Sequence, residues 1–139
     1  MIISTKGRYA LRVLVDLAEH RSDEYIPLKE IADRQGISEK YLESILKALV
    51  KNNIIAGLRG KGGGYRLSVD PAVLTAGAVL RLTETSLASV ACLNKDSDHC
   101  ERMDDCLTLP LWKGLDKLVC DYLCSVTISD LINGTIKPV

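Results

Sequence analysis

Residues 28–51 read LKEIADRQGISEKYLESILKALVK, and this stretch decides the fold. Its first part, residues 28–34, has the apolar spacing of a short helix, and Gly36 supplies a turn after it. Ser38 then fits the N-cap of a second helix. The apolar face of that second helix consists of Tyr41, Leu42, Ile45, Leu46 and Leu49. Two helices joined by a short glycine-containing turn predict a helix-turn-helix.

The sequence directly after the second helix predicts a β-hairpin. Residues 54–59 have strand composition, residues 60–64 (GKGGG) fit a hairpin tip, and residues 65–69 form the returning strand. A phosphate-binding loop is a poor interpretation of these glycines, because the Walker spacing is missing and the tip leads into a strand. A hairpin in this position is the wing of a winged helix.

Helices are also expected on both sides of this module. Apolar periodicity predicts one helix over residues 5–20, and Thr75 fits the N-cap of another over residues 76–84. A polar segment containing cysteines follows at residues 89–106, before a long amphipathic helix over residues 109–125. The expected fold class is therefore mainly α with a small β-hairpin.

Composition and charge divide the chain into two parts. The 139 residues are 47% hydrophobic and 26% charged, which is typical of one globular domain with an appendage. Residues 1–70 carry twelve Lys/Arg against nine Asp/Glu, whereas residues 71–139 carry six against nine. The basic part, a predicted winged-helix domain, is a candidate for a polyanionic partner. No apolar run approaches the ~20 residues that span a bilayer, so we expect a cytoplasmic protein without membrane contact.

Polar side chains near the start of the second helix of residues 28–51 could meet DNA. The outward positions are Ser38, Glu39, Lys40, Glu43 and Lys47, with Tyr41 at the boundary of the apolar face. Serine and lysine reach phosphates, and the N-terminus of a helix favours an anion. A carboxylate such as Glu43 is repelled by phosphate unless it accepts a hydrogen bond from cytosine in the major groove.

The hairpin tip is a second candidate for DNA contact. Arg59 and Lys61 flank Gly60 there, and glycine lets the backbone approach a groove closely. The pattern alone does not distinguish this DNA-binding arrangement from an ordinary helical domain.

Five cysteines occupy two different settings. Cys92, Cys100 and Cys106 lie in the polar segment, where thiolates could hold an iron–sulfur cluster or zinc, or could remain unligated and redox-active. Cys120 and Cys124 lie four residues apart on the long helix, and we expect them to be small buried hydrophobic residues.

Three motifs give the chain a specific resemblance. STKGRYA at residues 4–10, IADRQGIS at residues 31–38 followed by Tyr41-Leu42-Glu43, and RGKGGGY at residues 59–65 resemble the IscR/NsrR/CymR superfamily of bacterial winged-helix regulators. The order and spacing match over essentially the whole chain. The resemblance implies a homodimeric transcription factor that binds double-stranded DNA at a near-palindromic operator.

The resemblance also implies roles for individual residues. Ser38, Lys40, Tyr41 and Glu43 would lie in or beside the major groove, and Arg59 with the glycine tip would enter the minor groove. The apolar stripe of residues 111–123 would pair two copies through roughly antiparallel helices, so that residues 109–125 form a dimerisation helix.

For the cysteine segment, the resemblance implies an iron–sulfur cluster held by Cys92, Cys100 and Cys106. Relatives of the IscR type have a histidine three positions after the last cysteine, where this chain has Leu109. Relatives of the NsrR type use a carboxylate near the N-terminus, where this chain has Arg8. The fourth ligand and the cluster type, 2Fe–2S or 4Fe–4S, therefore stay open. Candidates for the fourth ligand are Asp98, His99, Asp104, Asp105 or a small exogenous molecule.

The sequence as a whole predicts a transcriptional regulator, more specifically a repressor that senses iron–sulfur, redox or nitric oxide status. One alternative is a CymR-like regulator of sulfur metabolism without a cluster, and another is a structural zinc module that acts by protein contacts. An enzyme is a poor interpretation, because neither His20 nor His99 belongs to a recognisable nucleophile–base arrangement.

Overall fold

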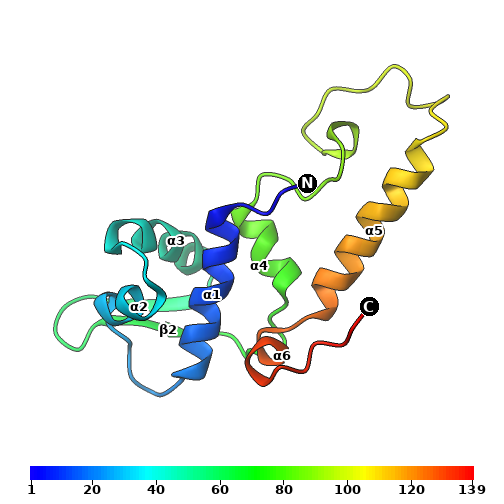
Figure 1. The fold of residues 1–139 in the computed structure, drawn as a ribbon. Coiled ribbons are helices and arrows are strands. Elements are labelled where there is room, and N and C mark those ends of the chain that lie inside the picture. The colour runs from blue at the N-terminus through cyan, green and yellow to red at the C-terminus, as the bar shows by residue number, and fades with distance from the viewer.

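Both helices expected within residues 28–51 are present in the computed structural model, which describes residues 1–139. The structure contains six α-helices, one short 3-10 helix and one antiparallel two-stranded sheet, so the predicted fold class is confirmed (Figure 1). In chain order the elements are α1 (Thr5–Glu19), α2 (Leu28–Gln35), α3 (Glu39–Lys51), β1 (Ile55–Leu58), β2 (Gly64–Leu67), α4 (Ala76–Thr83), η1 (Ala91–Leu93), α5 (Leu109–Ser125) and α6 (Ile128–Asn133).

Short polar side chains start most of the helices. Ser4, Ser38 and Thr75 accept hydrogen bonds from backbone amides in the first turns of α1, α3 and α4, as the sequence predicts for the last two. At the end of α2, Gly36 adopts a φ of 63°, a left-handed conformation that glycine reaches without strain. This turn sets α3 against α2 and completes the helix-turn-helix.

The hydrophobic core is centred on α1, which packs against α2, α3, α4 and α6. Its members are aliphatic, as expected for a chain without phenylalanine. Leu74, Val79 and Ile128 belong to the same cluster as Leu14 and Leu46. Residues after position 70 therefore complete the core of the winged-helix part.

The C-terminal helix α6 returns to the start of α4. The amide of Ala76 donates to the carbonyl of Val126 at 2.8 Å, and the amide of Ile128 donates to the carbonyl of Leu74 at 2.9 Å. Thr127 and Asp130 form a reciprocal capping box at the start of α6. These bonds hold Ile128, which is fully buried, against α1.

Helix α5 extends away from this body. It packs on α4, and Leu109 is its only buried residue (Figure 1). The irregular segment that joins α4 to α5 arches at the end of the molecule opposite the hairpin. None of the helices is long and apolar enough to cross a membrane.

Candidate nucleic-acid interface and cysteine segment

The apolar face of helix α3 holds the helix in the hydrophobic core. Leu42, Ile45, Leu46 and Leu49 are fully buried in the core. Because residues three and four positions apart share a face, burial of these four leaves the other face of α3 to solvent. Ser38, Lys40, Glu43 and Lys47 are all exposed there, as the sequence predicts.

Tyr41 lies at the edge of α3 and is held by aromatic contact with α1. Its ring meets that of Tyr9 edge to face, with 5.9 Å between the centroids. The guanidinium of Arg12 lies 5.0 Å from the centre of the Tyr9 ring. Tyr41 is half-buried, so its ring is oriented before any partner arrives.

A buried carboxylate connects α1 to the helix-turn-helix. Asp16, 2% exposed, accepts hydrogen bonds from Arg34 Nη2 at 2.7 Å, from Arg34 Nε at 2.9 Å and from Gln35 Nε2 at 2.8 Å. Burial by itself raises the pKa of Asp16, but the bonds from Arg34 and Gln35 outweigh it and hold the pKa below its usual value. The pairing of Asp16 with Arg34 was not predicted from the sequence. The one available indication was an acidic residue between the apolar positions Val13 and Leu17.

The hairpin is attached to the chain that leads into α2. The amide of Ile26 donates to the carbonyl of Tyr65, and the amide of Tyr65 donates to the carbonyl of Ile26, both at 2.8 Å. Gly64 makes this approach possible, because a Cβ there would lie 2.0 Å from the Ile26 carbonyl oxygen and its φ is 144°. The tip residues Arg59, Gly60 and Lys61 project from this base and are exposed.

A groove of about 600 Å³ lies between α3 and the hairpin. Three basic side chains line it, Lys47 and Lys51 from α3 and Arg59 from the hairpin, and no acidic residue does. Lys51 was not among the residues expected to contact DNA, although its position one helical turn after Lys47 places both on one face. The groove is a positively charged surface of the kind that binds a phosphate backbone.

The three cysteines of the polar segment are not gathered into one site. Cys92 lies in η1, Cys100 and Cys106 lie on either side of the turns at residues 101–105, and all three are partly exposed. No group of three or more His, Cys, Asp or Glu side chains in the chain is arranged to hold a metal ion. The expected trio therefore has the right ligand chemistry, but a cluster requires the segment to close around it.

Cys106 has the environment of a thiolate. The hydroxyl of Thr108 and the first backbone amides of α5, at Thr108 and Leu109, hold the pKa of Cys106 below its usual value, and Arg102 adds to the effect. Because a thiolate is the form that binds iron, Cys106 is suited to be a ligand.

The expectation that the two cysteines of α5 are small buried hydrophobic residues is wrong. Cys120 is exposed and Cys124 is only half-buried, so neither is a buried hydrophobic residue. Both sulfur atoms accept hydrogen bonds from Arg81 of α4, 39 and 43 residues away in the sequence. No local sequence pattern indicates a partner at that separation.

A stripe of apolar side chains on α5 has no partner within the chain. Its members are Leu111, Leu115, Leu118 and Tyr122, which are 62%, 41%, 71% and 41% exposed. They recur at alternating spacings of four and three residues, which is the a/d pattern of a helix that pairs with another helix. We call these four residues the α5 stripe.

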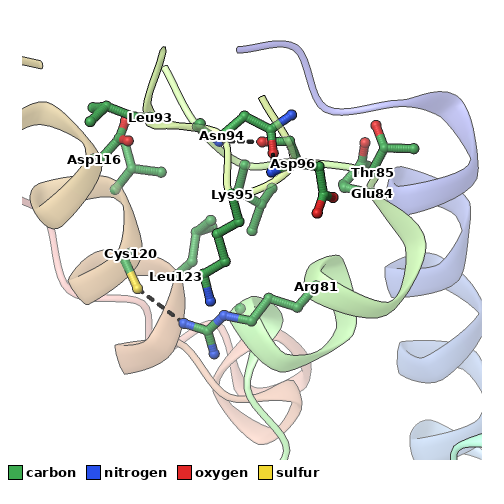
Figure 2. Close-up of a pocket in the computed structure, with 15 residues that line it drawn as sticks. Arg81, Glu84, Thr85, Leu93, Asn94, Lys95, Asp96, Asp116, Cys120 and Leu123 are labelled. Atoms are coloured by element: carbon green, nitrogen blue, oxygen red, sulfur yellow. Dashed lines mark hydrogen bonds between the residues drawn. The ribbon is translucent and has the colours of Figure 1, made fainter. Parts of the chain in front are cut away.

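The segment after α4 surrounds a second cavity, of about 480 Å³ (Figure 2). Arg81, Cys120 and Lys95 line it, together with the carboxylates of Glu84, Asp96 and Asp116. At its rim, the amide of Ser89 donates to Asp116 Oδ1 at 2.8 Å and so ties the segment to α5.

Comparisons with known proteins agree with this architecture. A family model described as Rrf2, iron-dependent transcriptional regulator, matches residues 3–134. The HTH-type transcriptional regulator IscR of Yersinia enterocolitica is 38% identical over 134 residues, covering 96% of this chain and 80% of that protein. The same values hold for IscR of Serratia proteamaculans.

Solved structures of transcriptional regulators also superimpose on this chain. CymR (YrzC), described as the global cysteine regulator of B. subtilis, superimposes with a TM-score of 0.77 at 33% identity, covering 96% of this chain and 97% of that one. IscR of T. potens superimposes with a TM-score of 0.75 at 32% identity, covering 97% of this chain and 88% of that one.

Proposed function

The chain belongs to the Rrf2 family of transcriptional regulators, and on that premise we propose that it is a cytoplasmic homodimeric repressor. It binds a near-palindromic operator, and the state of its cysteine segment controls how tightly. Members of this family regulate transcription and are not enzymes. The observation that carries the proposal is the groove between α3 and the hairpin, which basic side chains line and acidic ones do not.

Affinity for DNA comes from the groove and the hairpin tip. Lys47 and Lys51 neutralise phosphates along one strand, and each neutralised phosphate releases condensed counterions. Arg59, Gly60 and Lys61 of the hairpin enter or approach the adjacent minor groove. This part of the interaction does not depend on base sequence.

Sequence preference comes from the exposed face at the start of α3. Ser38 and Lys40 contact the backbone beside the major groove, and Tyr41 contacts it from the edge fixed by Tyr9. Glu43 is an exposed acidic side chain of α3 close to these groups, and it accepts a hydrogen bond from a cytosine amino group.

Two copies pair through the α5 stripe. Four large apolar side chains with this exposure are a poor surface for a monomer, and their spacing fits a second, antiparallel copy of the same helix. Gly114 lies between the stripe residues Leu111 and Leu115 and leaves room for close approach. Pairing doubles the DNA contacts and makes the half-site spacing part of the specificity.

Cys92, Cys100 and Cys106 would hold an iron–sulfur cluster, either 2Fe–2S or 4Fe–4S. The lowered pKa of Cys106 and the absence of regular secondary structure around Cys100 support this, because thiolates on an adaptable segment are suitable ligands. Such a cluster would supply one-electron chemistry and reactivity towards oxygen or nitric oxide. Asp98, His99, Asp104 and Asp105 are exposed candidates for the remaining ligand.

Hydrogen bonds and helix packing connect the cysteine segment to the DNA-binding half. The chain that leads from α4 into the segment starts at Glu84, which is hydrogen bonded to Ser4 at the start of α1. If the cysteine segment becomes more or less ordered, the hydrogen bonds that hold the start of α1 change as well. Helix α1 in turn packs against α2 and α3. This coupling is conformational, because the acidic segment itself is unsuited to contact phosphate.

A second candidate is a cluster-free regulator controlled by its thiols. The similarity to CymR over 97% of that chain and the absence of a gathered metal-binding group favour it. In that case the loop cysteines respond by oxidation rather than by ligand exchange.

One experiment separates the two candidates. Protein purified without oxygen is analysed for iron, sulfide and zinc, and its visible spectrum is recorded. Binding to a palindromic and to a scrambled duplex is then measured before and after cluster removal. Stoichiometric iron and sulfide, with a change in affinity on removal, are the expected results. Colourless protein with unchanged affinity rules out the cluster, and equal affinity for both duplexes rules out the operator.

A further inference from the structure

Arg81 of α4 bridges the two cysteines of α5. Its Nη2 atom donates to Cys120 Sγ at 3.0 Å, as Figure 2 shows, and to Cys124 Sγ at 3.1 Å, and the two sulfur atoms are 4.0 Å apart. These bonds raise the pKa of Arg81, the bond to Cys124 contributing most, so the guanidinium stays charged. Neither DNA binding nor the cysteine segment requires this arrangement.

Solvent and small molecules reach the site. Cys120 is exposed, Cys124 is half-buried, and the cavity of about 480 Å³ opens beside Cys120 and Arg81. The two cysteines face α4, since Arg81 reaches both sulfur atoms, whereas the α5 stripe is turned to solvent. A second copy bound to the stripe leaves the site open.

We propose that Cys120, Cys124 and Arg81 form a thiol-modification site, separate from the loop cysteines, at which small hydroperoxides oxidise the pair to a disulfide. Three features of this site are those of redox-sensitive cysteines: an accessible thiol, an adjacent positive charge and a second thiol within reach. Arg81 stabilises the negative charge that either sulfur acquires on ionisation.

Oxidation of the two thiols to a disulfide takes two steps. The Cys120 thiolate attacks one oxygen of ROOH, the O–O bond breaks, and ROH leaves after taking up a proton, so that Cys120 becomes a sulfenic acid. The Cys124 thiolate then attacks the Cys120 sulfur, the S–S bond forms, and the hydroxyl leaves as water with the proton that Cys124 lost. The two thiols lose two electrons and two protons in total, and the peroxide gains them.

Closing the disulfide changes the contact between α4 and α5. The sulfur atoms must approach from 4.0 Å to about 2.05 Å, and residues four apart on a helix have Cβ atoms farther apart than a disulfide allows. Cys124 lies in the last turn of α5, where the backbone can adjust. It also packs on Gly77, at which a Cβ would lie 2.9 Å from Cys124 Sγ. Oxidation therefore alters the contact that joins α5 to the rest of the molecule.

The test follows the thiols directly by mass spectrometry and needs neither DNA nor a cluster, so it is independent of the proposed function. Trypsin cleaves after Lys117 and releases residues 118–139, which contain Cys120 and Cys124 and no other cysteine. Full-length protein with Cys92, Cys100 and Cys106 changed to serine is treated with hydrogen peroxide, and the same treatment is repeated on the protein unfolded in urea. We expect this peptide to lose two hydrogen atoms faster in the folded protein.

Variants identify the roles of the three residues. Cys124→Ser should stop the reaction at a sulfenic acid on Cys120 that dimedone traps. Arg81→Gln should slow disulfide formation roughly fivefold. Arg81→Lys should retain part of the rate, and the exposed Arg21→Gln should retain all of it. Equal rates in the folded and unfolded chain, an unchanged rate in Arg81→Gln, or pairing of Cys120 with a second copy instead of Cys124 would overturn the proposal.

Discussion

Ser4 and Glu84 are joined by two hydrogen bonds across 80 residues of sequence. Glu84 Oε1 accepts from the Ser4 amide at 3.1 Å and from the Ser4 hydroxyl at 2.7 Å. The same hydroxyl oxygen accepts from the amide of Gly7 at 3.0 Å and so caps α1. The end of α4, which leads into the cysteine segment, and the first turn of α1 are therefore joined in one hydrogen-bonded unit.

Glu84→Ala should lower the free energy of unfolding by about 1–2 kcal/mol, because the partly buried Ser4 amide loses its charged acceptor. Urea denaturation measures the change. Glu24→Ala, at an exposed glutamate whose carboxylate has no partner, is the control and should change stability by less than about 0.5 kcal/mol. Equal effects of the two substitutions would show that the bond contributes nothing.

The ion pair of Asp16 with Arg34 predicts a pH dependence of stability. Asp16 has a lowered pKa in the folded protein, so its contribution is fully present above the unfolded-state pKa of about 3.9 and is lost as the pH falls through the folded-state pKa. Asp16→Asn should therefore destabilise the protein at pH 6, by about 2–3 kcal/mol after allowance for the partial exposure of Arg34. The difference from the wild type should shrink below about pH 4. Urea denaturation at several pH values measures it, and a difference independent of pH would contradict this role.

Lys51→Ala should weaken binding to every duplex alike and reduce the slope of log K against log salt by about 1. Lys51 lines the basic groove, and in the proposed complex it neutralises a phosphate without reading a base. Fluorescence anisotropy over a salt series measures both quantities. Lys137→Ala, on the exposed C-terminal tail, is the charge-matched control and should leave the slope unchanged.

Glu43→Ala should change base preference rather than overall affinity, by about 1–3 kcal/mol at one position of each half-site. Selection from a randomised operator library identifies that position. An unchanged preference would mean that α3 does not present this side chain to the major groove.

Leu118→Glu should convert the proposed dimer to a monomer, because it places a charge in the middle of the α5 stripe. Sedimentation at micromolar concentration distinguishes the two states. Leu107→Glu is the matched control, since Leu107 is 95% exposed and lies before α5, outside the stripe. A dimer that survives Leu118→Glu would place the interface elsewhere.

The sequence predicted the elements that local rules determine. The helix expected over residues 109–125 has those bounds in the structure, and Ser38 and Thr75 are the N-caps of α3 and α4. Apolar periodicity and capping act within one or two helical turns, so a single chain segment carries the information. The exposed positions of α3 follow from the same periodicity.

Contacts between distant segments could not be predicted in this way. Arg34 and Asp16 are 18 residues apart, and Arg81 and Cys124 are 43 apart, so each pair depends on how two helices pack. The basic groove likewise needs Lys51 from α3 and Arg59 from the hairpin. The spacing of Cys92, Cys100 and Cys106 indicates ligands but not the path of the chain between them.

Gly64 shows how little separates the hairpin from the entry to α2. A methyl group there would collide with the carbonyl of Ile26 and with the nitrogen of Pro27, which lies 2.7 Å from the Cβ position. The collision would break the two backbone hydrogen bonds between Tyr65 and Ile26 and tilt the hairpin about its base. Its tip, which carries Lys61, would move farther than its base does. The absence of one carbon atom thus sets the angle at which Arg59 and Lys61 leave the protein surface.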